Sequence, residues 1–145
     1  MKIRIIWAGK CKEHFVKEGI SKYLNLLSPF CKLEIIEIKE SKGKDIIRSL
    51  RKDGEKIINA SSGYVLLDEG GREMTSIQLS DYLLKSGDRD FVIGGAYGVS
   101  EEVTENASDV LSLSRLTFTH DMARLILLEQ IYRAFTIINR RGYHH

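Results

Sequence analysis

Cysteine and proline are scarce in this sequence. Its 145 residues include two cysteines, Cys11 and Cys31, and one proline, Pro29. The cysteines fall on separate expected elements without metal-type spacing, so the sequence predicts two free thiols in a reducing cytosol rather than a disulfide framework. Pro29 closes the first helical region.

Long apolar runs and an excess of one charge are also lacking. No apolar stretch is long enough to cross a bilayer. The segment Met1–Ala8 carries Lys2 and Arg4 inside a short apolar run, which is not the pattern of a signal peptide. The formal net charge is only +2, so the overall charge does not demand a nucleic-acid partner. We expect a cytoplasmic protein with no membrane partner.

The composition that remains is that of a folded domain. Hydrophobic residues make up 43% of the chain and charged residues 29%, which is ordinary for a globular protein and too apolar for a disordered one. A chain of this length suits one domain, residues 1–145.

Hydrophobic periodicity predicts strands that alternate with helices. The expected strands cover residues 2–8, 32–39, 64–68, 91–93 and 110–113. The expected helices cover a pattern from 16 to 27, then 44–59, 75–85, a short segment after Ser100, and 120–139. A loop is expected at Gly70-Gly71. The alternation is typical of an α/β domain with a mostly parallel sheet flanked by helices.

The last expected helix, residues 120–139, is apolar around more of its circumference than one core-facing stripe requires. A helix of this kind is buried on more than one side. The sequence therefore predicts a second subunit that covers it, as in a homodimer. The alternative is a central helix enclosed within one protomer.

Two segments could approach a ligand. The glycine-rich loop Gly94–Gly98 (GGAYG) follows a short strand, and its backbone could come close to a bound molecule, although a tight turn explains it equally well. The segment 112–120 (SLSRLTFTH) alternates small polar with apolar residues, so its backbone could bind an adenine edge while leucine and phenylalanine pack on the ring. It could also be a strand followed by a helix that Thr119 caps.

The C-terminal segment is basic. No acidic residue follows Glu129, whereas Arg133, Arg140, Arg141, His144 and His145 do. Together with Tyr143, these suit phosphate binding and base stacking, while a disordered end is the alternative.

The other charged residues are expected to have structural roles. The basic residues of the second expected helix are interpreted as a solvent-exposed face. Glu129 is expected to pair with Arg133, four residues on. No set of His, Cys or carboxylate residues has metal-ligand spacing, so no metal is expected.

A resemblance to a known family adds to this reading. The segments IRIIWAGKCKE, EIIEI, LLDEGGREMTS, DFVIGGAYGVS, SLSRLTFTHDMARLILLEQIYRAF and GYHH follow one another along nearly the whole chain. In this order they resemble the SPOUT superfamily of α/β-knotted methyltransferases, and within it the enzymes that act on large-subunit ribosomal RNA. The resemblance implies a six-stranded α/β domain with a C-terminal trefoil knot, and a homodimer.

The resemblance also implies an activity and a site. The activity is S-adenosylmethionine-dependent methylation of N3 of a pseudouridine in large-subunit (23S) rRNA, with the assembled ribosome as substrate. The implied cofactor residues are Leu67, Gly94, Leu113, Ser114, Arg115, Leu116, Thr117 and Phe118. The implied catalytic residues, on the substrate side, are Arg133, Tyr143 and His144.

Two positions depart from the family pattern. Thr119 stands where the family usually has proline. Gly142 stands where the family often has proline or alanine. The first is expected to loosen the exit of the cofactor loop, and the second to give the tail more freedom.

Two other functions stay open at this stage. One is another SPOUT activity on a tRNA base or ribose, and the other is a non-catalytic ribosome-binding factor.

Overall fold

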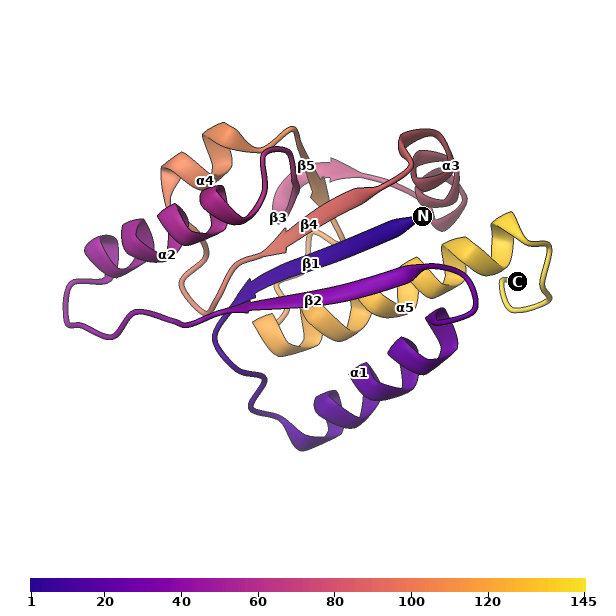
Figure 1. Ribbon diagram of the computed structural model, residues 1–145, viewed down its shortest axis with the longest axis horizontal. Coiled ribbons are helices and arrows are strands. Elements are labelled where there is room, and N and C mark those ends of the chain that lie inside the picture. The colour runs from indigo at the N-terminus through magenta and orange to yellow at the C-terminus, as the bar shows by residue number, and fades with distance from the viewer.

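The computed structural model describes residues 1–145 as a parallel sheet covered by helices on both faces (Figure 1). The strands are β1 (Lys2–Ala8), β2 (Lys32–Ile38), β3 (Val65–Glu73), β4 (Arg89–Ile93) and β5 (Asp109–Ser112). The helices are α1 (His14–Leu27), α2 (Ile46–Ala60), α3 (Ser76–Ser86), α4 (Glu101–Asn106) and α5 (His120–Ile138). The α/β class and the expected order of elements are confirmed.

The sheet order is β2-β1-β4-β3-β5, and every neighbouring pair is parallel. The sheet has five strands, so the six-stranded count that the resemblance implied is wrong here. The loop expected at Gly70-Gly71 is also wrong, because β3 continues through these glycines to Glu73. β3 pairs with β5 on both sides of an irregularity between Leu67 and Arg72. The two glycines mark a bulge within the strand, and the sequence alone did not distinguish this bulge from a loop.

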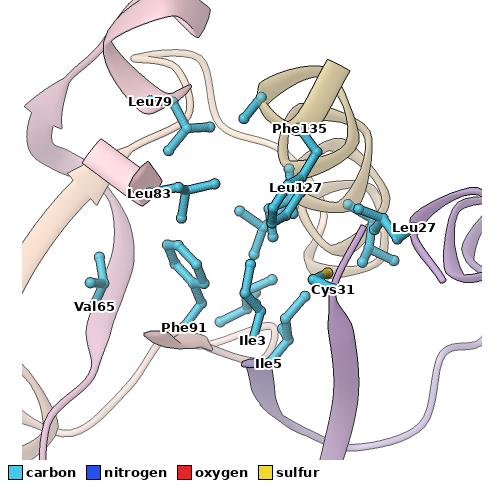
Figure 2. Close-up of a cluster of buried hydrophobic side chains, with 14 of the residues drawn as sticks. Ile3, Ile5, Leu27, Cys31, Val65, Leu79, Leu83, Phe91, Leu127 and Phe135 are labelled. Atoms are coloured by element: carbon cyan, nitrogen blue, oxygen red, sulfur yellow. The ribbon is translucent and has the colours of Figure 1, made fainter. Parts of the chain in front are cut away.

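Each face of the sheet has its own apolar core. The larger core lies between the sheet and α1, α3 and α5, where Figure 2 shows Phe91 of β4 near Leu83 of α3 and Leu127 of α5. The smaller core includes Ile6, Ile57, Tyr64, Leu66, Val92 and Val103, and lies beneath α2 and α4. Burial on both faces explains why the inner strands β3 and β4 contain continuous apolar runs, at residues 65–67 and 91–93.

Two local features of the helices follow from their sequences. Thr75 begins α3 with a capping box, since its hydroxyl accepts from the backbone N–H of Gln78 and the Gln78 side chain accepts from the backbone N–H of Thr75. Gly54, which is unfavourable inside α2, is explained by packing. A Cβ there would clash with Oγ of Ser100, so α2 approaches the start of α4 closely.

Helix α5 packs on the sheet between α1 and α3 of its own protomer. Leu127, Leu128, Ile131, Ala134 and Phe135 are buried there, while Met122, Leu125, Ile126 and Tyr132 stay partly exposed. One protomer therefore covers much of this helix but leaves apolar side chains at its margins. No helix of the protein is long and apolar enough to cross a membrane.

Candidate functional site

A cleft of about 720 Å³ lies at the carboxyl edge of the sheet. It is lined by three segments that follow β3, β4 and β5, namely 67–69, 93–99 and 113–120, together with Ala123 of α5. Ligands in open α/β sheets bind at this edge, and the volume suits a small organic molecule. All of the predicted cofactor residues except Arg115 line the cleft. The structure thus brings Leu67, Gly94 and the segment 113–118, which are far apart in sequence, together around one cleft.

The first segment is a bulge within β3. Leu67 and Arg72 both register with Leu111 of β5, so the residues between them loop out of the ladder. Asp68 and Glu69 lie in this bulge and line the cleft. Gly71 lets the chain return, because a Cβ at this position would lie 2.8 Å from backbone atoms of β5. The bulge therefore directs two carboxylates to the cleft.

The second segment is a tight turn that requires glycine at two positions, Gly94 and Gly98. A Cβ on Gly94 would lie 2.9 Å from the backbone carbonyl group of Gly98, and Gly98 has a φ of +80°. Gly95 and Gly98 form an isolated bridge that closes the turn. The backbone of this loop consequently forms one wall of the cleft with little side-chain cover.

The third segment, 113–118, is shaped by its own hydroxyls. Ser112 Oγ donates to the carbonyl of Ser114 at 2.9 Å, and Ser114 Oγ accepts from the N–H of Leu116 at 3.0 Å. Thr117 Oγ1 donates to Glu69 Oε2 at 2.6 Å, which ties this loop to the bulge. Leu116 lines the cleft with 74% of its surface exposed, so an apolar side chain is available to a ligand.

Arg115 and Thr119 sit differently from the rest of this loop. Arg115 is exposed, forms an ion pair with Glu73, and does not line the cleft. Thr119 caps α5, since its Oγ1 accepts from the N–H of Met122 at 3.2 Å, and its φ of −61° is one that proline also adopts. The hydroxyl cap fixes the loop exit that the loss of proline was expected to loosen.

Arg133, Tyr143 and His144 form a second cluster, at the C-terminal end of α5. Arg133 Nη1 lies 3.3 Å from His144 Nδ1, and its guanidinium lies 4.8 Å from the centre of the Tyr143 ring. The expected Glu129–Arg133 ion pair is confirmed. The Tyr143 hydroxyl also donates to Glu129, at 3.1 Å. The predicted substrate-side residues are therefore in mutual contact.

Burial and hydrogen bonding tune this cluster. Burial, together with hydrogen bonds to Tyr23 and Glu129, raises the pKa of the Tyr143 hydroxyl. The hydrogen bond to Glu129 raises the pKa of Arg133. At neutral pH, Tyr143 is thus a hydrogen-bond donor and Arg133 a fixed cation.

The two clusters lie at opposite ends of α5 in one protomer. None of Arg133, Tyr143 and His144 lines the cleft. His120, which does, precedes Arg133 by a helical rise of about 20 Å. Figure 1 shows the C-terminus at the far end of α5, on the same side of the molecule as the N-terminus. A single protomer therefore does not bring the predicted cofactor residues and the predicted substrate-side residues together.

Several cleft residues were not predicted from the sequence. They are Asp68, Glu69, Ile93, Val99 and Ala123. A signal existed for the two carboxylates, because they directly follow a continuous apolar strand whose carboxyl end had to lie at the binding edge.

Both cysteines are free, as expected. Burial raises the pKa of Cys31 to about 11. Burial and a hydrogen bond with Asp121 raise the pKa of Cys11. Neither thiol is present as the reactive thiolate at neutral pH, which argues against a cysteine nucleophile.

Comparisons with known proteins match the whole of this architecture. A family model described as "Predicted SPOUT methyltransferase" matches residues 1–144. The "Ribosomal RNA large subunit methyltransferase H" of Thermodesulfovibrio yellowstonii is 46% identical over 145 residues, covering 99% of both chains. Proteins of the same name from Geobacter sulfurreducens and Trichlorobacter lovleyi are 41% and 40% identical, covering all of both chains.

Proposed function

The chain belongs to the SPOUT methyltransferase family, whose fold is the α/β knot, and we propose that it methylates large-subunit ribosomal RNA with S-adenosylmethionine as the donor. The observation that carries the proposal is the convergence of the three loops after β3, β4 and β5 on one cleft. Full-length relatives that are 40–46% identical bear the name of such an enzyme. A ribosomal substrate implies that the protein works in the cytoplasm.

The cleft residues fit this donor. Gly94 and Gly98 leave the backbone of one wall bare, so its N–H and C=O groups can approach an adenine or a ribose. Leu67, Leu113, Leu116 and Phe118 supply apolar surface for the nucleoside, and Ser114 and Thr117 supply hydroxyls. When bound, S-adenosylmethionine supplies an electrophilic methyl on a positively charged sulfur. Arg115 is not expected to contact the donor directly, because it forms an ion pair with Glu73 and does not line the cleft.

We propose that Arg133, Tyr143 and His144 bind the substrate base, a pseudouridine that is methylated at N3. A uridine-type N3 is a poor nucleophile while it carries its proton, so methylation requires that proton to leave. An imidazole is a suitable acceptor near neutral pH, which gives His144 this role. The Arg133 guanidinium stabilises the imide anion that develops, and Tyr143, whose hydroxyl donates to Glu129, stacks on or orients the base.

The separation of the two clusters supports a homodimer as the working unit. Because the tail of one protomer lies about 20 Å along α5 from its own cleft, a second copy is the economical source of the tail that faces the donor. The partly exposed apolar residues Met122, Leu125, Ile126 and Tyr132 on α5 provide surface for such a contact. Exposed Phe15 lies on the neighbouring helix α1, which packs against α5.

Transfer of a labelled methyl group tests the proposed function. The protein is incubated with labelled S-adenosylmethionine and either assembled ribosomes or naked rRNA, both from a strain that lacks the gene. We expect label at N3 of a pseudouridine of large-subunit rRNA, with ribosomes the better substrate because so small a protein has little surface for RNA recognition. Label in tRNA instead would identify another SPOUT activity. An absence of donor binding by calorimetry would identify a non-catalytic factor.

A further inference from the structure

The cleft is lined by carboxylates and by no lysine or arginine. Asp68 and Glu69 are its acidic residues, and His120 is its single basic one. Even with His120 protonated, the lining keeps a net negative charge. His120 also lies 3.4 Å from the carboxylate of Asp121, outside the lining. Such a surface disfavours anions, a nucleic-acid backbone included, and favours a cation.

Neither cleft carboxylate is neutralised by the protein. Asp68 Oδ2 accepts from the N–H of Gly70 at 2.9 Å, and Glu69 Oε2 accepts from the Thr117 hydroxyl at 2.6 Å. The arginines on the adjoining segments have other partners, since Arg72 pairs with Asp109 and Arg115 pairs with Glu73. The bulge of β3 thus presents two carboxylates that have hydrogen-bond donors but no counter-ion.

We propose that Asp68 and Glu69 make the cleft selective for charge, so that it binds the cationic methyl donor more tightly than the neutral product. This inference rests on the proposed function. S-adenosylmethionine has a sulfonium, an ammonium and a carboxylate, and its net charge is +1. S-adenosylhomocysteine lacks the sulfonium charge and is neutral overall. The two molecules share their remaining polar groups, so charge is the main property that the cleft can use to distinguish them.

The transfer step itself removes the attraction. The lone pair of the deprotonated N3 forms the new nitrogen–carbon bond, and the electron pair of the broken sulfur–carbon bond stays on sulfur. The N3 proton has already passed to the proton acceptor, His144, and the charge on sulfur changes from +1 to zero. Two carboxylates that attract the donor therefore lose this interaction with the product, which favours product release after each turnover.

Isothermal titration of the full-length protein tests this inference through binding alone. Asp68→Asn and Glu69→Gln remove the charge and retain an oxygen acceptor for Gly70 and Thr117. The ligands are S-adenosylmethionine, S-adenosylhomocysteine, and sinefungin, which has an amine where the sulfonium methyl stands. Each substitution is expected to lower the preference for the cationic ligands over S-adenosylhomocysteine by about threefold, the effect of a partly solvated charge about 6 Å away.

Glu105→Gln is the matched control. Glu105 is exposed on α4, forms none of the protein's ion pairs and does not line the cleft, so its substitution should leave the preference unchanged. About 0.5 M KCl should weaken binding of the two cations in the wild type and leave binding of S-adenosylhomocysteine unaffected. An unchanged preference in both cleft variants would overturn the inference while the proposed function stands. Failure of the wild type to bind any of the three ligands would overturn the proposed function instead.

Discussion

The guanidinium of Arg124 lies 4.6 Å from the centre of the Trp7 ring, in full burial. Its Nη2 donates to the carbonyl of Ala8 at 2.8 Å, and its Nη1 lies 3.6 Å from Asp121. Asp121 in turn accepts from the backbone N–H groups of Lys12 and Glu13, at 2.9 Å each. This network joins the end of β1, the residues before α1 and the start of α5, where His120 and Ala123 line the cleft.

Arg124→Ala should destabilise the protein strongly. The substitution leaves Asp121 buried without its cation and opens a cavity against Trp7, so we expect the free energy of unfolding to fall by about 3 kcal/mol. Urea denaturation monitored by Trp7 fluorescence and circular dichroism measures the change. Arg51→Ala, at an exposed position on α2, should cost less than about 0.5 kcal/mol. Equal effects in the two variants would contradict the structural role of the buried network.

Gly94→Ala should weaken donor binding. The added Cβ would lie 2.9 Å from the Gly98 carbonyl group, which is backbone and cannot move aside as a side chain can. The loop must open, and we expect the affinity for S-adenosylmethionine to fall by at least about tenfold, the effect of roughly 1.4 kcal/mol. Calorimetry gives the affinity. Gly63→Ala is the control, because a Cβ there meets no atom within 4 Å, and its binding should match the wild type.

Asp90 should contribute stability that acid removes. Burial alone would raise its pKa, but hydrogen bonds from Arg4 and Ser61 outweigh burial and hold the pKa of Asp90 below its ordinary value of 3.8. A depressed pKa means that the contribution is complete above the unfolded-state pKa and is lost as the pH falls through the folded-state value. Asp90→Asn should therefore lower the free energy of unfolding at pH 6 by about 1–2 kcal/mol.

The same variant should differ less from the wild type at lower pH. Urea midpoints measured in steps from pH 6 to about pH 3 should converge, because acid protonates the wild-type carboxyl and produces a similar neutral group. A gap between the two proteins that is constant across this range would show that the charge of Asp90 is not what stabilises the pair with Arg4.

His144→Ala and Arg133→Ala should each lower turnover on ribosomes by at least about 100-fold, the usual effect of losing a general base or an anion-stabilising group. Neither residue lines the cleft, so affinity for S-adenosylmethionine should stay within about twofold of the wild type. Single-turnover transfer and calorimetry separate these quantities. Normal turnover in both variants would remove them from the reaction.

Mixed dimers should reveal whether the two clusters meet across subunits. Gly94→Ala protein and His144→Ala protein are denatured together and refolded, and assayed at a donor concentration low enough that each variant alone is strongly impaired. Half of the resulting dimers are mixed, and each mixed dimer has one intact pair of cleft and partner tail, so about a quarter of the wild-type activity should return. Activity that stays at the level of the separate variants would indicate that each protomer uses its own tail.

The fold could be predicted further from the sequence than the site. Apolar runs such as 64–68 and 91–93 indicated buried parallel strands, and the pattern of polar and apolar residues located every helix. The continuation of β3 through Gly70 and Gly71 could not be predicted, because the ladder resumes only after a bulge whose closure depends on contact with β5. Local sequence does not record a contact with a strand about 40 residues later.

Residue patterns alone indicated Gly94–Gly98, 112–120 and the basic C-terminal segment as candidates, the resemblance added Leu67 and the individual roles, and the structure adds their arrangement. Leu67, Gly94 and Leu113 are far apart in sequence and meet only because parallel strands end at one edge. Asp68 and Glu69 were missed, although their place after an apolar strand was a usable signal. The fold-back of Tyr143 onto Glu129 depends on the turn after α5, where Arg140 adopts a φ of 54°, and no sequence pattern predicted it.

The length of α5 has a consequence for evolution and engineering. One inserted residue between His120 and Arg133 would turn everything beyond it by about 100° and advance it by about 1.5 Å, so the tail would face a different neighbour. Residues 42–44 lie between Ser41, whose N–H donates to Asp53, and Asp45, which caps α2; this short stretch could change in length at small cost. Insertions and deletions should therefore be tolerated before α2 and excluded from α5.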